Sequence, residues 1–192
     1  MILETERLQL REFAERDWQA VLAYQNDPRY LRYYPWQSRT EAEVRAFIQV
    51  FIEWQAYLRR YKFQWAITMK SNGQLIGNAG IRKESVADHK AEVGYEINPQ
   101  FWGMGYASEA ARAVRDFGFQ ELGLRRIWAN CLAENLASRR VLEKIGMQLE
   151  GTLRDNEYFK ERYWDTCIYA ILVNEIDWAN KESQAQPKAG RT

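Results

Sequence analysis

The chain has 192 residues, 46% of them hydrophobic and eight of them tryptophan, which is enough for one folded domain with a full-sized core. Its 27 basic and 26 acidic residues nearly cancel, so no global field attracts nucleic acid or an anionic membrane surface. One histidine, His89, and two cysteines far apart in sequence, Cys131 and Cys167, disfavour a metal site and indicate a reducing compartment.

The N-terminal segment predicts a strand, a helix and a loop, in that order. Apolar and polar residues alternate in RLQLREF (residues 7–13), as in a short strand. Asp17 can cap a helix that ends near Asn26, because the residue before Pro28 disfavours helical geometry. YLRYYPW (residues 30–36) follows as an aromatic loop.

The next segment predicts a long helix and a β-hairpin. Ser38 or Thr40 opens the helix, which runs to about Arg60 with apolar residues at helical spacing. Beyond it the apolar period changes to two. FQWAITM (residues 63–69) and QLIGNAGI (residues 74–81) flank an SNG turn, which is typical of a hairpin.

After a polar loop, the chain alternates between strands and helices. AEVGYEI (residues 91–97) is predicted to be a strand in which Gly94 marks a bulge or a close backbone approach. A helix then runs to about Leu122, and RRIWANCL (residues 125–132) is the next strand. NLASRRVLEKIG (residues 135–146) is a helix that its final glycine stops.

The remaining residues, up to about Val173, are hairpin-like, and a polar tail begins at Asn180. We therefore expect a single α/β domain over residues 1–178, with a mixed, mostly antiparallel sheet flanked by helices, and a polar, disordered tail over residues 179–192. The start resembles no secretory leader, and no apolar run reaches the ~18 residues of a membrane span. We expect a cytoplasmic monomer or homodimer that binds neither nucleic acid nor a membrane.

A loop that contains two glycines but no lysine or arginine, NPQFWGMGYASEA (residues 98–110), precedes a predicted helix. Glycine at 103 and 105 tolerates positive φ and removes side chains that would block a ligand. A helix N-terminus carries roughly half a positive charge and about four unpaired N–H groups, so it can hold a pyrophosphate without a basic side chain. A P-loop pattern is missing, and the dinucleotide pattern fails at Ser108. A glycine-rich turn without a ligand is the alternative.

The same loop resembles the pyrophosphate-binding loop of the GNAT superfamily of N-acetyltransferases, whose pattern is Q/R-x-x-G-x-G/A. TERLQLR, EVGYEINP and CLAENLASRRVLEKIGM also occur, in this order, in the branch that contains the ribosomal-protein N-terminal acetyltransferases. The resemblance spans about Leu3 to Val173 and implies a GNAT-like domain, with a sheet splayed at the cofactor cleft, that uses acetyl-coenzyme A (acetyl-CoA). The cofactor-binding residues that it implies are Ile97, Gln100, Trp102, Gly103, Met104, Gly105, Tyr106, Ala107 and Asn135.

Acetyl transfer to an amine needs a neutral nucleophile, a stabilised oxyanion and a proton for the leaving thiolate. The resemblance implies that a backbone N–H at Ile97 could serve the oxyanion and that Asn135 bonds the pantetheine arm, although asparagine is also an ordinary N-cap. Ser138 shares a face with the apolar stripe of its helix. It matches the family's proposed proton donor, and packing of a small residue is the alternative.

Glu157 matches the family's proposed general base. It has the same parity as Leu149 and Leu153, so without a bulge it faces the core, whereas a register shift would leave it solvated. Glu92 and Glu96 lie on one face of the strand at residues 91–97 and stay open as alternative bases.

The acceptor is expected to be a primary amine beside two aromatic-rich segments, YLRYYPW and NEYFKERYW, which in this fold flank the acceptor side. The expected substrate contacts are Tyr33, Tyr34, Trp36, Glu92 and Tyr158. An α-amine with a pKa near 8 needs about 1.4 kcal/mol to deprotonate at pH 7, whereas lysine needs about 4.6 kcal/mol, so the N-terminus of a protein or peptide leads. A small-molecule amine (a polyamine, amino acid or aminoglycoside) and a non-catalytic acyl-CoA-binding module are the alternatives. The family transfers directly, so we expect no acetyl-cysteine on Cys131.

Overall fold

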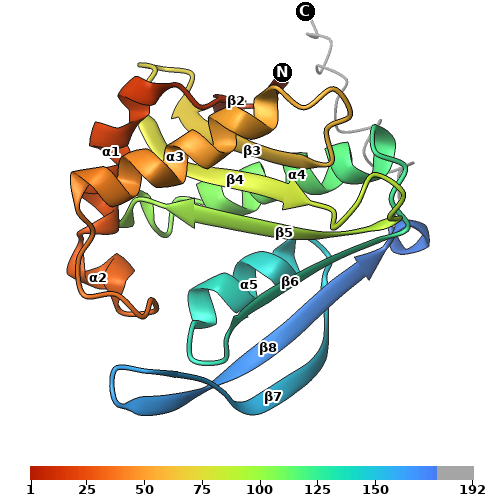
Figure 1. Cartoon of the computed structure of the whole chain (residues 1–192). Coiled ribbons are helices and arrows are strands. Elements are labelled where there is room, and N and C mark those ends of the chain that lie inside the picture. The colour runs from red at the N-terminus through yellow and green to blue at the C-terminus, as the bar shows by residue number, and fades with distance from the viewer. Residues whose placement is uncertain (177–192) are drawn as a thin grey trace, which may run out of the picture.

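The computed structural model describes residues 1–176, which form one sheet with helices on both faces (Figure 1). The expected domain end at residue 178 and the expected polar tail lie outside the described residues. The fold class predicted from the sequence, a mixed α/β domain with a mostly antiparallel sheet, is confirmed.

Eight strands of the described residues form the sheet, in the order β1-β2-β3-β4-β5-β6-β8-β7. Neighbouring strands are antiparallel except β5 and β6, which are parallel. The strands are β1 (Ile2–Glu4), β2 (Leu8–Glu12), β3 (Lys62–Met69), β4 (Leu75–Arg82), β5 (Lys90–Ile97), β6 (Arg126–Leu132), β7 (Gln148–Phe159) and β8 (Arg162–Leu172). The helices are α1 (Trp18–Gln25), α2 (Pro28–Leu31), α3 (Glu41–Gln55), α4 (Tyr106–Gln120) and α5 (Leu136–Lys144), with 3₁₀ turns η1 (Glu15–Asp17), η2 (Pro99–Phe101) and η3 (Val173–Glu175).

Helices α4 and α5 cover one face of the sheet. The buried stripe of α4 includes Val114 and Phe117, spaced one turn apart. The Phe117 ring meets Trp65 of β3 edge-on, with 5.2 Å between the ring centroids. Leu142 and Ile145, at the end of α5, join the same buried cluster. This face therefore holds the larger core.

Helices α1, α2 and α3 cover the opposite face, and Figure 1 shows α1 and α3 in front of the sheet. Val44, Ile48 and Phe51 recur at helical spacing along α3 and are buried. Thr40 begins this helix with a capping box, because its side chain accepts from the Glu43 N–H while the Glu43 carboxylate accepts from the Thr40 N–H at 2.7 Å.

Two predictions about helix ends are wrong. Asp17 precedes α1 but does not cap it, because its carboxylate accepts two hydrogen bonds from Arg11, each of 2.7 Å, and one from the Ala14 N–H. The long helix ends at Gln55 and not at Arg60, because the chain turns back there toward β3.

Two short elements were not predicted. The expected aromatic loop at residues 30–36 begins inside α2, whose N-cap is Asp27. Residues 2–4 form β1, which pairs antiparallel with β2. Both are too short to give a periodic pattern in the sequence.

Candidate active site

The two central strands, β5 and β6, diverge after a short parallel pairing of residues 90–92 with residues 126–128. On its other edge β5 stays paired with β4, and the Asn98 N–H donates to the Ile76 carbonyl at 2.8 Å. Backbone groups alternate between the two edges of a strand, so the N–H groups of Tyr95 and Ile97 point away from β4 into the opening. The sheet is therefore splayed, and it presents backbone donors at its edge.

The loop between β5 and α4 adopts a conformation that favours glycine. Gly103 and Gly105 have φ of 80° and 83°, in the left-handed region. Gly105 is the N-cap of α4 and supplies no capping side chain, and the Glu109 N–H donates to its carbonyl at 3.0 Å. The amides of residues 106–108 precede this bond, so they point out of the helix end and give it a partial positive charge.

A cleft of about 940 Å³ passes through the opening between the strands. Most of the expected cofactor-binding residues line it: Ile97, Trp102, Gly103, Gly105, Tyr106, Ala107 and Asn135. So do both expected catalytic residues and most of the expected substrate contacts: Ser138, Glu157, Tyr33, Tyr34, Glu92 and Tyr158. Arg140 and Lys144, four residues apart on α5, add two cations that the sequence reasoning missed. The helix end, the strand edge and these cations fit a long ligand with amide groups and phosphates.

Three expected site residues do not line the cleft. Trp36 is separated from the cleft by a residue that lines it, Tyr34, on which it stacks with 4.7 Å between ring centroids. Gln100 is exposed, and its N–H donates to the Asn98 side chain at 3.0 Å. The Met104 side chain is 53% exposed. The sequence pattern of the loop does not separate residues that face the cleft from residues that shape its backbone.

Ser138 lies at the first turn of α5, held by two neighbours. The Asn135 side chain accepts a hydrogen bond from the Ser138 N–H at 3.1 Å, which is the predicted N-cap. The Tyr95 hydroxyl donates to the Ser138 carbonyl at 3.0 Å and lies 3.0 Å from Ser138 Oγ. Burial raises the pKa of Tyr95, so this phenol stays protonated at neutral pH. Tyr95 lines the cleft, and the sequence reasoning did not single it out.

Glu157 lines the cleft, but the parity argument that pointed to it is wrong. Leu149 and Leu153 are exposed, by 46% and 47%, and the pairing of β7 with β8 shifts register twice before Glu157. Asp155, with φ of 51°, lies in the second shift. The Glu157 side chain is exposed, and no hydrogen bond or ion pair holds it among residues 1–176.

Glu96 has the opposite environment, because four donors hold its carboxylate. Asn78, Gln25 and Tyr24 donate to Oε2 at 2.9, 3.1 and 3.2 Å, and Tyr34 donates to Oε1 at 3.3 Å. Burial first, and the nearby Glu96 charge second, raise the pKa of both tyrosines. The Glu96 side chain is thus held in place by four donors, two of them phenols that stay protonated at neutral pH.

The polar cluster continues along the sheet to Glu92. Gln64 donates to the Asn78 side chain at 2.7 Å and accepts from Arg82 at 3.0 Å. Arg82 also lies 3.4 Å from the Glu92 carboxylate. A Cβ at Gly94 would lie 2.8 Å from the Arg82 guanidinium, so glycine lets this side chain cross β5. The predicted bulge or close backbone approach is not found there, because the β4–β5 register is unbroken at Gly94 and the approaching group is a side chain.

The two groups of polar side chains reach the cleft from opposite faces of the sheet. Side chains alternate along a strand, so Glu92 and Glu96 lie on the face covered by α1 and α3, while Tyr95 lies on the face of α4 and α5, beside Ser138. The opening between β5 and β6 is where these faces meet.

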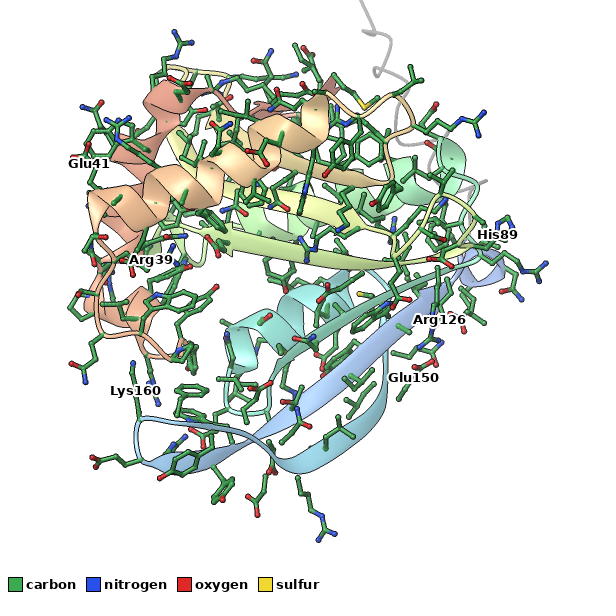
Figure 2. The ribbon with its side chains drawn as sticks, viewed as in Figure 1. Arg39, Glu41, His89, Arg126, Glu150 and Lys160 are labelled. Carbon is green, nitrogen blue, oxygen red and sulfur yellow. The ribbon has the colours of Figure 1, made fainter. Side chains whose placement is uncertain are left out.

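The turn between β7 and β8 closes one side of the cleft. Lys160 donates to the Leu31 carbonyl of α2 at 2.6 Å, and Figure 2 shows its side chain between the turn and α2. Tyr158 and Phe159, at the end of β7 just before the turn, line the cleft together with Tyr30 and Tyr34. Both aromatic-rich segments predicted from the sequence therefore border the same half of the cleft.

Cys131 also lines the cleft, on β6. Burial raises its pKa to about 11, with smaller contributions from nearby groups. A nucleophilic cysteine needs the thiolate form, and the Cys131 thiol is protonated at neutral pH. This environment favours direct transfer over an acetyl-cysteine.

Among residues 1–176, no cluster of three histidine, cysteine, aspartate or glutamate side chains could hold a metal ion. None of the helices described is long and apolar enough to cross a membrane.

Comparisons with known proteins identify the fold and the family. Residues 7–148 match the family described as the acetyltransferase (GNAT) domain. The uncharacterized N-acetyltransferase YnaD of Bacillus subtilis (strain 168) is 37% identical over 91% of this chain and 99% of its own length. A GNAT-family acetyltransferase structure from Bacillus anthracis is 35% identical, with a TM-score of 0.78 over 90% of this chain and 98% of that one. RimL, a ribosomal L7/L12 α-N-protein acetyltransferase in complex with coenzyme A (CoA), shares the fold at 21% identity, with a TM-score of 0.79 over 92% of this chain and all of its own.

Proposed function

Because the chain belongs to the GNAT family of acetyltransferases and uses acetyl-CoA, we propose that it acetylates the α-amine of a protein or peptide N-terminus. The observation that carries this proposal is the cleft between β5 and β6, where Ser138 approaches from one face of the sheet and carboxylates approach from the other. RimL, which shares the fold, is described as an α-N-protein acetyltransferase.

The donor occupies the side of the cleft lined by α4 and α5. The helix end at Gly103 and Gly105 holds the pyrophosphate through backbone N–H groups, and Arg140 and Lys144 add positive charge. Asn135 and the backbone edge of β5 bind the pantetheine arm. When bound, acetyl-CoA supplies a thioester whose acetyl carbon is open to attack by an amine.

Proton transfer is divided between two side chains. Glu157 accepts the proton of the attacking amine, directly or through one water, because its carboxylate has no other partner among the described residues. Glu96 is a poorer base, since its oxygens already accept four hydrogen bonds. Ser138 Oγ donates a proton to the departing sulfur as it takes one from solvent, so the serine stays neutral, and the Ile97 N–H stabilises the oxygen that gains charge.

The free energy needed to deprotonate the acceptor favours an α-amine. Removing a proton at pH 7 costs about 1.4 kcal/mol for an α-amine and about 4.6 kcal/mol for lysine. A single exposed carboxylate is better suited to deprotonating an α-amine than to deprotonating lysine. Glu96 and Glu92, with Tyr33, Tyr34 and Tyr158, border the acceptor half of the cleft and attract the positive charge of the incoming amine.

The test is a screen for thiol release from acetyl-CoA, with mass spectrometry of the products. The panel contains peptides with a free N-terminus, the same peptides with a blocked N-terminus and an internal lysine, and small amines such as spermidine. We expect acetylation at the α-nitrogen of the free peptides alone. Turnover confined to the small amines would assign the alternative acceptor. CoA binding without any acetylated product would indicate a non-catalytic acyl-CoA-binding module.

A further inference from the structure

Arg7, near the N-terminus, contacts the glycine loop that lies almost a hundred residues later in the sequence. It lies in the turn between β1 and β2, and its Nη1 donates to the carbonyl of Met104 at 3.0 Å. Its Nε donates to the Glu109 carboxylate at 2.7 Å, and its Nη2 lies 2.6 Å from the same carboxylate. The guanidinium also lies over the ring of Tyr106, 4.4 Å from the centroid. All three nitrogens of the guanidinium are thus engaged at the N-terminus of α4.

The contact with Met104 fixes the direction of one backbone amide. In a trans peptide the C=O and the following N–H point in opposite directions. Because Arg7 holds the Met104 carbonyl, the Gly105 N–H of the same peptide must point away from Arg7. Gly105 lies between two hollows and lines both, the 940 Å³ cleft and a hollow of about 840 Å³, whereas Arg7 lines only the second. The Gly105 N–H is therefore turned toward the cleft.

Arg7 also compensates a carboxylate that would oppose an anionic ligand. Glu109 lies in the first turn of α4, with its side chain 16% exposed. Burial alone would raise the pKa of Glu109, but hydrogen bonds from Thr5 and Arg7 outweigh it and lower the pKa. Glu109 is therefore an anion at neutral pH, at the helix end that would receive the pyrophosphate. The Thr5 hydroxyl also donates to the Glu109 carboxylate, at 2.5 Å, so it and Arg7 together stabilise the negative charge of Glu109.

We propose that Arg7 is a positioning residue for the donor site, which acts through the Met104–Gly105 peptide and through Glu109 and makes no contact with the ligand itself. The inference rests on the proposed role of the glycine loop in holding the pyrophosphate. A loop without basic residues binds its anion because a distant arginine orients its amides and neutralises its carboxylate.

The test compares two ligands that differ in the pyrophosphate. Titration calorimetry with CoA measures binding through the loop, and ligand-observed NMR with S-acetyl-pantetheine measures binding through the arm alone. We expect Arg7→Met to raise the dissociation constant for CoA at least tenfold and to leave that for S-acetyl-pantetheine within twofold. Arg7→Lys keeps a charge near Glu109 but lacks the fork that reaches two partners, so it should weaken CoA binding at least threefold.

Arg126 supplies the matched control. It also forms an ion pair with a glutamate through two guanidinium nitrogens, which donate to the two carboxylate oxygens of Glu150, and Figure 2 shows this pair on the opposite side of the molecule from Lys160. Neither residue lines the cleft. Arg126→Met should leave both dissociation constants within twofold, and circular dichroism with thermal melting checks that every variant folds.

Unchanged CoA binding in both folded Arg7 variants would overturn the inference. An equal loss for CoA and S-acetyl-pantetheine would also overturn it, because a general distortion of the cleft weakens both ligands. Failure of the unaltered chain to bind CoA at all would instead refute the proposed donor site.

Discussion

Replacing Gly103 with valine separates the conformational role of the loop from its role in binding. Gly103 has φ of 80°, and a Cβ there would meet nothing within 4 Å. The change therefore crowds no neighbour, and its cost to stability is the left-handed conformation, about 1–2 kcal/mol. For a chain of this length that corresponds to a fall in the melting temperature of about 2–8 °C. Because Gly103 lines the cleft, the valine side chain would also take up space in the part proposed to receive the pyrophosphate.

Gly123 provides a control with the same local geometry. Its φ is 60°, a Cβ would meet nothing within 4 Å, and it does not line the cleft. Gly123→Val should cost about the same 1–2 kcal/mol and leave CoA binding unchanged. Gly103→Val should weaken CoA binding at least tenfold, or about 1.4 kcal/mol.

Thermal unfolding and titration calorimetry on both variants measure the two effects independently. If Gly103→Val bound CoA as tightly as the unaltered chain, the reasoning would be refuted, because the loop would then hold no part of the ligand. If both variants lost CoA affinity by the same factor, the reasoning would also fail, since the effect would follow the loss of stability alone.

The remaining predictions concern the proton donor and acceptor, the helix cap and the cysteine. Glu157→Gln should lower turnover about 10²–10⁴-fold at neutral pH, and the loss should shrink as pH rises because the amine then deprotonates without help. Ser138→Ala should keep its defect to higher pH, and flat, equal losses for both variants in a pH–rate profile would show that neither moves a proton. Asn135→Ala removes the acceptor of the Ser138 N–H, so it should cost about 1 kcal/mol of stability in a denaturant titration and raise the KM for acetyl-CoA; an unaltered KM would leave only the capping role. Cys131 has its pKa raised to about 11 from 9.0, so the folded state favours the protonated thiol, and its stabilising contribution is present below pH 9 and is lost as pH rises toward 11. Its alkylation should be slow at neutral pH and accelerate with pH up to that value, whereas labelling at the rate of a free thiol would contradict the burial.

The sequence alone specified most of the secondary structure, because the signals are local. The alternation in residues 63–69 and 91–97 and the helical spacing in α3, α4 and α5 each depend on one segment's own residues. The Thr40 cap could be read in the same way. Asp17 could not, because its carboxylate pairs with Arg11 of the neighbouring strand and makes no side-chain bond to the helix end.

The glycine loop was also predictable, through motif spacing and family resemblance, and most of the site residues predicted in this way line the cleft. Glu157 does line the cleft. The argument from strand parity that pointed to it is wrong, because two register shifts in β7 separate Glu157 from Leu149 and Leu153. A bulge depends on how a strand pairs with its partner, and one sequence does not specify that pairing.

What only the tertiary structure decided is which distant residues share a partner. Tyr24 and Gln25 of α1, Tyr34 after α2 and Asn78 of β4 all meet at Glu96. The contact from Arg7 to the glycine loop spans 97 positions. Periodicity records which way a side chain points from its own strand or helix, but these contacts depend on strand order, register and the opening between β5 and β6. Those features come from packing the whole chain around two covered faces of one sheet, so no local pattern encodes them.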